Sequence, residues 1–476
     1  MKPLCSALML AGLLGVSPPG FAESTEELAA RLDAMSAEIK ELRAELARVK
    51  AQQAGVEAAE AAPVPAAASP APPAVAATVA APNNTSEPTK AVPVTTPRSI
   101  AAAPRPGAAP GVMVISTAAA ADSGNEQQTT IFGYGEFNYT RPRNNSAATQ
   151  FDVRRAILGI GHRFDESTRF AMELEFEHAV TSKDDRGEVA VEQAFVDHAF
   201  KPGLGMQAGL FLLPVGFLNR RHEPTAYYGV ERNFVETAII PSTWREGGAA
   251  LRGDTESGLT WSTGLTTGFD LSKWNAASSD GRESPLGSIH QEGQLARAKN
   301  LAGFGALEYI GVPGLLVGGF VFTQKAGQGQ AGFTAASPGI TLWDLHARWT
   351  PGKWDLSAVY AAGRISGTSE LNLVTIGNPT PIPKAFFGWY LQGAYTVWTR
   401  GDRSLSPFVR YERFNTASQY AAFPPGLGIA AGQTERVVTA GASFRLNPNV
   451  VFKADYQKFD IDPSRDRFSL GLGYAF

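Results

Sequence analysis

Arg467-Phe468-Ser469-Leu470-Gly471-Leu472-Gly473-Tyr474-Ala475-Phe476 is the final stretch of the 476-residue chain. Large apolar residues alternate along it with small or polar residues. This period of two predicts a β-strand with one apolar face and one polar or small face. Such a strand fits either the edge of a soluble sheet or the wall of a barrel that spans a membrane. The rest of the chain distinguishes the two.

The same alternation recurs far upstream. Between Arg169 and Glu177 four large apolar residues face one way and mostly charged residues face the other, and similar patterns occupy 342–349, 354–360 and 452–457. Charged residues make up 18 % of the chain, against about 25 % in soluble proteins. Beyond the amino-terminal leader no apolar run reaches the about 18 residues that a membrane helix needs. Alternation without such a run is typical of a membrane barrel, with lipid outside and water inside.

We therefore predict an all-β transmembrane barrel of about 16 antiparallel strands. The predicted strands lie near 130–139, 151–164, 168–179, 189–200, 205–212, 244–252, 258–269, 300–310, 315–323, 340–349, 354–364, 385–398, 405–414, 435–445, 450–459 and 466–476. Short turns such as 201–203 and 351–353, each with the Gly, Pro, Asp or Asn of a tight reversal, alternate with long connections such as 214–243, 270–299 and 366–384. Because short turns face the periplasm in such barrels, both ends of the barrel are expected there.

Three segments are expected before the barrel. Residues 1–22 have the basic start, apolar stretch and small-x-small cleavage site of a signal peptide, and they contain the single cysteine, Cys5. Residues 23–58 carry apolar residues at alternating spacings of three and four, which predicts a short periplasmic α-helical coiled coil; a lone amphipathic helix is the alternative. Residues 59–128 are an Ala/Pro-rich linker. The barrel is expected over 129–476.

The long connection 214–243 is where we expect selectivity. A barrel of about 16 strands encloses a channel too wide to select among small solutes without an inserted constriction. This connection has more aromatic and charged residues than an external loop needs, so we predict that it folds inwards. Its candidate constriction and substrate-binding residues are Arg220, Arg221, Arg232, Arg245, Glu223 and Glu231, with Glu236 and Glu246 also facing the arginines. The alternative is an external loop whose arginines bind lipopolysaccharide or neighbouring loops.

Charged residues at the alternate strand positions that should point inwards form a second set of candidates, which line the lumen. They are Arg155, Arg163, Arg169, Glu173, Glu175, Arg348, Arg410, Lys453 and Arg467. Residues 129–476 contain 33 Lys and Arg and 33 Asp and Glu, so net charge favours neither ion sign. Of the basic residues 24 are arginine, whose planar guanidinium binds phosphate and carboxylate, and rings of Arg or Lys favour anions in pores. This predicts an anion preference; arginines paired with the glutamates would instead be structural.

The sequence argues against an enzyme. The six histidines show no pair at metal-ligand spacing, and the Gly-x-Ser-x-Gly elbow and the phosphate-binding Gly-Lys-Ser/Thr loop are missing from the sequence. We therefore predict no catalytic residue, cofactor, metal or nucleic-acid partner. A hydrolase embedded in a barrel, with residues converging from distant loops, is the remaining alternative.

Four stretches carry a family resemblance: Phe151-Asp-Val-Arg-Arg-Ala-Ile-Leu-Gly-Ile-Gly161, Pro241-Ser-Thr-Trp-Arg-Glu-Gly-Gly248, Ser406-Pro-Phe-Val-Arg-Tyr-Glu-Arg-Phe-Asn415 and Leu446-Asn-Pro-Asn-Val-Val-Phe-Lys-Ala-Asp-Tyr-Gln457. The chain resembles the phosphate-selective porin O and P family from about Phe132 onwards. The resemblance implies a trimer of sixteen-stranded barrels with an inward loop and a lumen ladder of arginines that conducts anions. The chain departs from the family at the constriction, where a lysine cluster is expected and 214–243 contains no lysine.

The sequence thus predicts an outer-membrane porin of a Gram-negative bacterium, with passive diffusion of small anions such as phosphate. Two alternatives stay open: a general or organic-solute porin, and a tether between the outer membrane and the cell wall. The expected partners are outer-membrane lipid, lipopolysaccharide, two further copies in a homotrimer and small anionic solutes. The barrel-assembly machinery is expected to recognise the last strand, which ends in Phe476.

Overall fold

The computed structural model describes residues 128–182 and 185–476. The predicted signal peptide and coiled coil lie outside these residues, as does the predicted linker except for its last residue. The β-strands are β1 Thr129–Pro142, β2 Gln150–Arg163, β3 Thr168–Glu177, β4 Val189–Lys201, β5 Leu204–Leu212, β6 Arg245–Asp254, β7 Leu259–Thr266, β8 Ala302–Tyr309, β9 Leu315–Lys325, β10 Gly339–Trp349, β11 Trp354–Ile365, β12 Ala385–Tyr395, β13 Trp398–Arg400, β14 Arg403–Gln419, β15 Glu435–Asn447, β16 Val450–Phe459 and β17 Arg467–Ala475.

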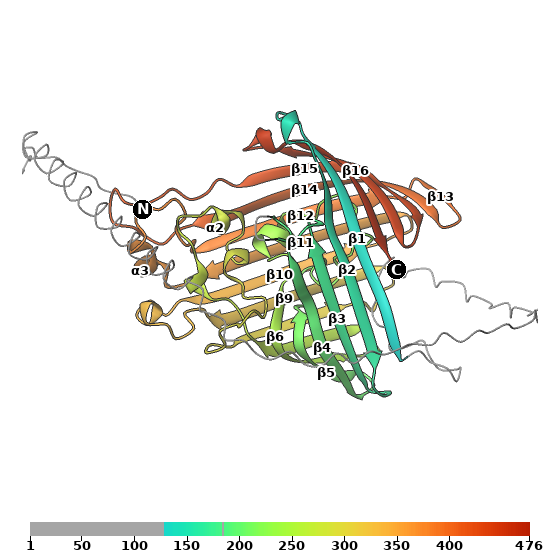
Figure 1. Cartoon of the computed structure of the whole chain (residues 1–476), viewed down its shortest axis with the longest axis horizontal. Coiled ribbons are helices and arrows are strands. Elements are labelled where there is room, and N and C mark those ends of the chain that lie inside the picture. The colour runs from blue at the N-terminus through green and yellow to red at the C-terminus, as the bar shows by residue number, and fades with distance from the viewer. Residues whose placement is uncertain (1–127, 183–184) are drawn as a thin grey trace, which may run out of the picture. The chain divides into compact units, whose positions relative to one another are not determined.

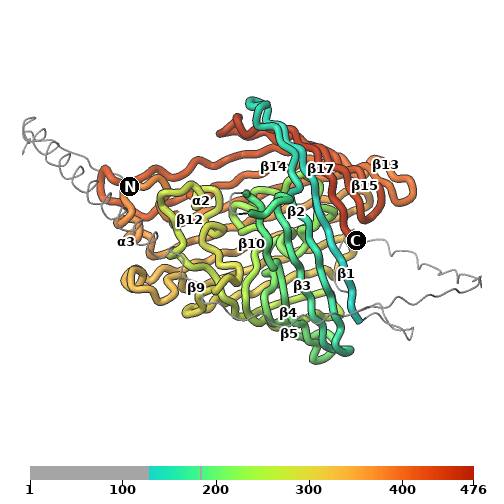
Figure 2. Tube along the Cα trace, in the orientation of Figure 1, coloured from blue at the N-terminus to red at the C-terminus, as the bar shows by residue number. Residues whose placement is uncertain are grey.

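These strands form one closed antiparallel barrel (Figure 1). Each strand except β12 pairs with the next along the chain. Because β12 and β13 both pair with β14, β13 continues β12, which makes 16 strands in the wall. The cylinder closes where β1 pairs with β17, from Tyr134 opposite Ala475 to Pro142 opposite Arg467. Figure 2 shows the first strand, in cyan, beside the last strands, in red. The predicted fold class and strand number are confirmed.

The two faces of the wall have opposite chemistry. Outward residues are large, apolar and exposed, such as Leu345 at 61 % and Val409 at 55 %, whereas their inward neighbours Asp344 and Arg410 are 1 % and 2 % exposed. A soluble protein has the reverse arrangement. Aromatic residues collect on the outer face near both ends of the strands: Trp343, Tyr360, Trp389 and Tyr411 towards the long loops, and Trp349, Trp354, Tyr395 and Trp398 towards the short turns. Exposed apolar side chains between two aromatic belts match a lipid bilayer.

Helices are short and lie in the connections. They are the α-helices α2 Asp280–Glu283 and α3 Thr368–Leu373, a π-helical turn at Val235–Ile239, and 3₁₀ turns at Ser146–Ala148, Leu271–Lys273, Gly287–Ile289, Ala331–Phe333 and Pro463–Arg465. Within the described ranges, none of these helices has the length and apolar character to cross a bilayer.

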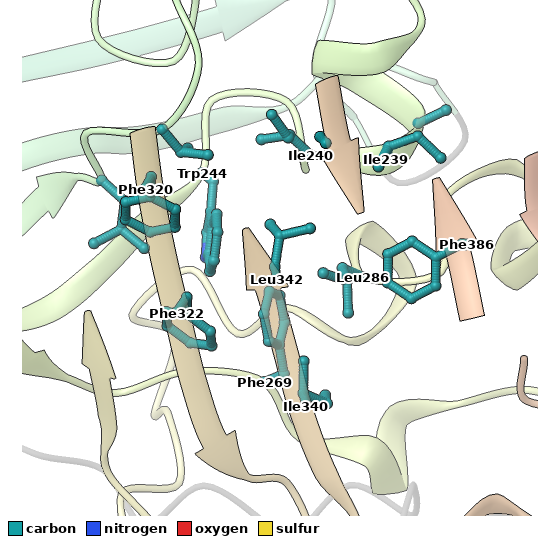
Figure 3. Packing of buried hydrophobic residues seen from close by; sticks show 14 of the residues in the cluster. Ile239, Ile240, Trp244, Phe269, Leu286, Phe320, Phe322, Ile340, Leu342 and Phe386 are labelled. Carbon is teal, nitrogen blue, oxygen red and sulfur yellow. The ribbon is translucent and has the colours of Figure 1, made fainter. Parts of the chain in front are cut away.

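The long-loop half of the barrel contains an apolar core, which the sequence did not predict. Inward residues of β8–β12, including Phe304, Phe322 and Leu342, pack with side chains of the loops 213–244 and 267–301 (Figure 3). The expectation that the inner face is polar along every strand is therefore wrong here. Two long loops fold into the barrel, and their apolar side chains are removed from water by packing against an apolar patch of wall.

Trp244 is the largest fully buried side chain of this core. Its ring stacks on Phe269, with centroids 5.0 Å apart, and meets Phe322 edge-on at 4.7 Å.

We predict that Trp244→Ala lowers stability by about 3–5 kcal/mol, the usual cost of removing a buried aromatic side chain. The change would appear as a lower temperature for loss of the folded electrophoretic mobility in detergent. The matched control is Trp349→Ala, because Trp349 is 51 % exposed on the outer wall. Equal effects of the two substitutions would contradict the packing described here.

Candidate functional site

The connection between β5 and β6, residues 213–244, lies inside the barrel, and we call it the crossing loop. Asn219 closes its base: the side-chain amide donates to the carbonyls of Leu213 and Trp244, each at 2.8 Å, and its oxygen accepts from the Trp244 amide at 2.6 Å. Leu213 and Trp244 also share a backbone hydrogen bond of 3.0 Å. The loop therefore leaves and re-enters the wall at one fixed point.

On one side the crossing loop is bound to the wall of β1–β4. The Tyr227 hydroxyl donates to Glu136 at 2.7 Å, and Asn138 donates to Glu231 at 3.2 Å. The ring of His222 lies 2.5 Å from a Glu192 oxygen. Most of these groups are buried, so each contact replaces water that the polar side chain would otherwise hold.

On the other side the loop reaches β11 and β14–β16. Five contacts join them: Tyr228 Oη to Asp355 at 2.9 Å, the Val230 amide to Asp455 at 2.7 Å, the Phe234 amide to Glu412 at 2.6 Å, Lys453 Nζ to the Gly229 carbonyl at 2.8 Å, and Ser443 Oγ to the Tyr228 carbonyl at 2.7 Å. Many of these bonds use loop backbone groups. The wall charges thus fix the path of the loop across the lumen.

Within the loop, Glu236 folds the chain onto itself. Its carboxylate accepts from the amides of Phe217 and Leu218 at 2.5 and 2.7 Å, from the Asn233 side chain at 2.7 Å and from the Tyr390 hydroxyl at 3.2 Å. Burial raises the pKa of Glu236, and these hydrogen bonds oppose the rise. Its role is structural.

The six candidate constriction residues all lie on or beside this loop, but they do not form the expected pairs. Arg220 pairs with Glu308 of β8 at 3.7 Å, and Arg245 pairs with Glu292 of the loop 267–301 at 3.1 Å. Arg232 donates to the hydroxyls of Ser242 and Thr243 at 2.7 and 2.9 Å, and Glu231 accepts from Asn138. Glu223 has one buried oxygen without a hydrogen bond. Arg221 lies near Glu308, Arg220 and Arg348. The predicted facing of Arg220, Arg221, Arg232 and Arg245 by Glu223, Glu231, Glu236 and Glu246 does not appear as ion pairs among the described residues, because Arg220 and Arg245 pair with Glu308 and Glu292 instead. Glu246 instead accepts from Trp244 and Thr267.

The strand register places the nine lumen candidates on the inner face of the wall. Four arginines have a polar partner on the wall: Arg155 pairs with Glu136, Arg348 with Asp355, Arg410 with Glu412 and Arg467 with Gln457. Lys453 lies over the Tyr227 ring, and Glu173 and Glu175 are buried. Arg163 and Arg169 lie opposite each other near the short-turn end. Several of these residues therefore hold the crossing loop in place and do not face solvent.

Inside the barrel, many acidic side chains of the wall are buried, whereas a group of arginines beside the crossing loop is more exposed. The acidic residues of the inner wall are mostly covered by the loop: Glu136, Glu173, Glu175, Glu192, Asp344, Glu412 and Asp455 are all less than one-tenth exposed. Beside the crossing loop, Arg220 has 48 % of its side chain exposed and its neighbours Arg221, Arg348 and Arg445 are half-buried, while elsewhere on the inner wall Arg252 is 32 % exposed beside Asp197. We call the four arginines beside the loop the arginine cluster. Burial is the main cause of a lowered pKa at Arg221, and Arg220 and Arg348 lower it further while Glu308 raises it.

Sequence reasoning missed four of the partners that shape this site: Glu192, Glu308, Asp355 and Arg445. Glu308, Asp355 and Arg445 lie on the inner parity of their strands, so a complete reading of the alternation would have included them. Glu192 was harder to find, because a β-bulge displaces the alternation of β4 at this residue.

The sequence matches no family model. It is 32 % identical over 346 residues to a protein of Aquifex aeolicus (strain VF5) described only as uncharacterized, and the match covers 71 % of this chain and 77 % of that protein. The chain belongs to the family of that protein. The resemblance to the phosphate-selective porin O and P family is not confirmed by this match.

The fold of this family member is that of a porin. OmpF of Salmonella typhi, solved in complex with daunomycin, superposes with a TM-score of 0.51 at 15 % identity, over 73 % of this chain and 97 % of OmpF. The anion-selective porin of Comamonas acidovorans gives a TM-score of 0.46 at 12 % identity, over 74 % of this chain and all of that one. The likeness to OmpF concerns the fold alone.

We predict that Asn219→Ala loosens the crossing loop and leaves the wall intact. Losing three hydrogen bonds at the loop base lowers the free energy of local opening by about 1–3 kcal/mol. Amide exchange of residues 213–244 should therefore become about 10- to 100-fold faster. Hydrogen–deuterium exchange with mass spectrometry measures it. Asn449→Ala, in an exposed short turn, is the control. Unchanged exchange in Asn219→Ala would show that the base is held by other contacts.

Proposed function

We propose that this barrel is a porin through which small anions diffuse passively. The observation that carries this proposal is the segregation of charge inside the barrel, where acidic groups are covered and the arginine cluster remains open. Beside the crossing loop, the Glu308 and Asp355 side chains are 15 % and 11 % exposed, less than the 48 % of Arg220. Guanidinium groups in a narrow, partly desolvated passage attract anions and repel cations.

The crossing loop supplies the narrowing that such selection needs. An unobstructed barrel of 16 strands is wide enough for an aqueous channel without discrimination. The contacts of the loop with opposite walls support a position of its arginines within the lumen. Arg220 and Arg221 lie on the loop itself, and Arg348 and Arg445 lie on the wall beside it, so both sides of the passage carry positive charge.

Phosphate is the solute class we propose for this site. A guanidinium group binds phosphate oxygens through two parallel hydrogen bonds, which a lysine ammonium cannot do. The resemblance to the phosphate-selective porin O and P family points the same way. In this chain arginines would take the place that a lysine cluster has in that family.

The location and partners follow from the porin proposal. We place the barrel in the outer membrane of a Gram-negative bacterium, with the short turns towards the periplasm and the long loops outside. Lipid and lipopolysaccharide contact the outer wall, three chains form a homotrimer, and the barrel-assembly machinery recognises the strand that ends in Phe476. The amino-terminal coiled coil would lie in the periplasm.

A second candidate, a general porin without ion preference, is favoured by the carboxylates that accompany the arginines. Arg220 lies 3.7 Å from Glu308 and Arg348 lies 2.5 Å from Asp355. If these pairs cancel the positive charge, neutral sugars and both ion signs would pass equally. Swelling of liposomes in uncharged sugars, compared with ion selectivity in planar bilayers, distinguishes the two functions.

We predict that the double variant Arg220→Ala/Arg221→Ala reduces anion selectivity. Removing two of the four arginines of the cluster leaves Glu308 without its arginine partner, so the permeability ratio of chloride to potassium falls towards one or below it. The reversal potential in a salt gradient across a planar bilayer measures this ratio. Arg436→Ala, on the outer wall, is the control. An unchanged reversal potential in the double variant would exclude the crossing loop as the filter.

We predict the opposite change for Glu308→Gln. The substitution keeps the shape of the side chain and removes the negative charge beside Arg220 and Arg221, so anion selectivity increases. The same measurement of reversal potential applies. A shift towards cations would contradict the assigned charge balance.

A further inference from the structure

A second cluster of polar side chains lies where the crossing loop meets the wall, and it is separate from the arginine cluster. Glu173 of β3, Glu192 of β4 and His222 of the loop each bring one donor atom to a common point, with all three atoms within 4.8 Å of one another. The residues are 8 %, 0 % and 3 % exposed. Two carboxylates and an imidazole are thus buried together.

The backbone aims Glu192 into this point. Glu173 pairs with Gln193 and the next residue of β3, Leu174, pairs with Val191, so Glu192 is the extra residue of a β-bulge. A bulge redirects a side chain at the expense of ladder regularity. Glu192 therefore joins Glu173 on the inner face.

His222 presents one nitrogen to the carboxylates in a fixed orientation. Its Nδ1 lies 3.0 Å from the Asn219 carbonyl oxygen, which only accepts, so Nδ1 carries the hydrogen. Arg155 donates to the His222 carbonyl and so fixes the backbone. The other nitrogen, Nε2, faces Glu192 Oε1. A histidine held by a carbonyl in this way is typical of metal ligands.

The hydrogen bonds present do not satisfy every polar atom of Glu173, Glu192 and His222. Nε2 of His222 is 2.5 Å from Glu192 Oε1, and the Tyr134 hydroxyl is 2.5 Å from the same nitrogen. A proton between His222 and Glu192 would satisfy that pair but not Glu173, whose Oε2 is buried without a hydrogen bond. Buried carboxylate oxygens without partners are costly and call for an ion or water.

A second histidine in the barrel shows what an ordinary ion pair looks like here. His346 has Nδ1 2.5 Å from Asp344 and Nε2 3.4 Å from Glu308, so each ring nitrogen faces its own carboxylate. Nδ1 of His346 is hydrogen-bonded to Asp344, and its Nε2 is buried without a hydrogen bond. At His222, in contrast, two carboxylate oxygens and one ring nitrogen all lie within 4.8 Å of one another.

We propose that Glu173, Glu192 and His222 bind a divalent first-row transition-metal ion, such as Zn²⁺, Mn²⁺ or Co²⁺. One imidazole and two carboxylates suit these ions better than Ca²⁺ or Mg²⁺, which prefer oxygen ligands alone. The double positive charge balances two carboxylates, while the nearby Arg155 is neutralised by Glu136 at 2.8 Å. The Tyr134 hydroxyl supplies a fourth donor atom beside the ion.

The fit requires only a small movement. Donor atoms around a tetrahedral ion at about 2.0–2.1 Å lie about 3.3 Å apart, so Nε2 and the Glu192 oxygen would separate by less than about 1 Å. Rotation of the glutamate side chains provides that movement. The ion would then clip the crossing loop to β3 and β4.

The test is titration of the EDTA-treated, detergent-purified chain with Co²⁺, followed by visible absorption. One equivalent of Co²⁺ is expected to bind per chain. Glu173→Gln keeps the side-chain shape and should weaken binding at least tenfold, and His222→Gln should do the same. The control is His178→Gln, which removes the His178–Asp152 pair of 3.0 Å elsewhere in the barrel and should bind Co²⁺ as the unaltered chain does.

A second readout is the melting temperature, which Co²⁺ should raise in the unaltered chain and in His178→Gln but not in Glu173→Gln. The proposal is overturned if the unaltered chain binds no Co²⁺, or if Glu173→Gln binds it with the same affinity. The first of these outcomes does not depend on whether any variant folds. Neither measurement involves conductance, so failure of the porin function leaves this test intact.

Discussion

The hydrogen bonding of β1 to β17 is the constraint on which the rest of the structure depends. It gives every strand two neighbours, so the wall has no open edge and all its ladder groups are paired within the sheet. In hydrocarbon an unpaired backbone group costs several kcal/mol. Closure therefore permits the exposed apolar surface between the two aromatic belts. It also creates an enclosed interior whose contents are decided by the inward side chains and the loops.

That interior is more filled than an open pore. The crossing loop spans it between β1–β4 and β11–β16, held by carboxylates that accept from its backbone and hydroxyl groups, and the loop 267–301 joins it in an apolar core. Several acidic residues of the inner wall serve this anchoring, and the arginine cluster lies beside the loop in a more exposed position. The contacts that position the loop therefore also bury these carboxylates.

The sequence predicted the wall well, because a period of two and the short turns depend on local residues alone. Every predicted strand lies within a few residues of an observed one, and the predicted inner parity of Arg348 and Lys453 agrees with the register. It failed where long-range packing decides the outcome. The partners of Arg220 and Arg245, on β8 and on another loop, depend on the three-dimensional path of the crossing loop. Glu192 depends on a bulge, and the apolar core depends on which loops enter the barrel.

The central claim is that the crossing loop lies within the conducting lumen. The chain has a single cysteine, Cys5, within the predicted leader, so a thiol introduced in the barrel is unique after cleavage. We would measure the conductance of single channels of Arg220→Cys before and after a charged thiol reagent, with Arg436→Cys on the outer wall as the comparison. The account predicts a stepwise change of conductance in Arg220→Cys and none in Arg436→Cys. An unchanged conductance in a fully modified Arg220→Cys channel would contradict it.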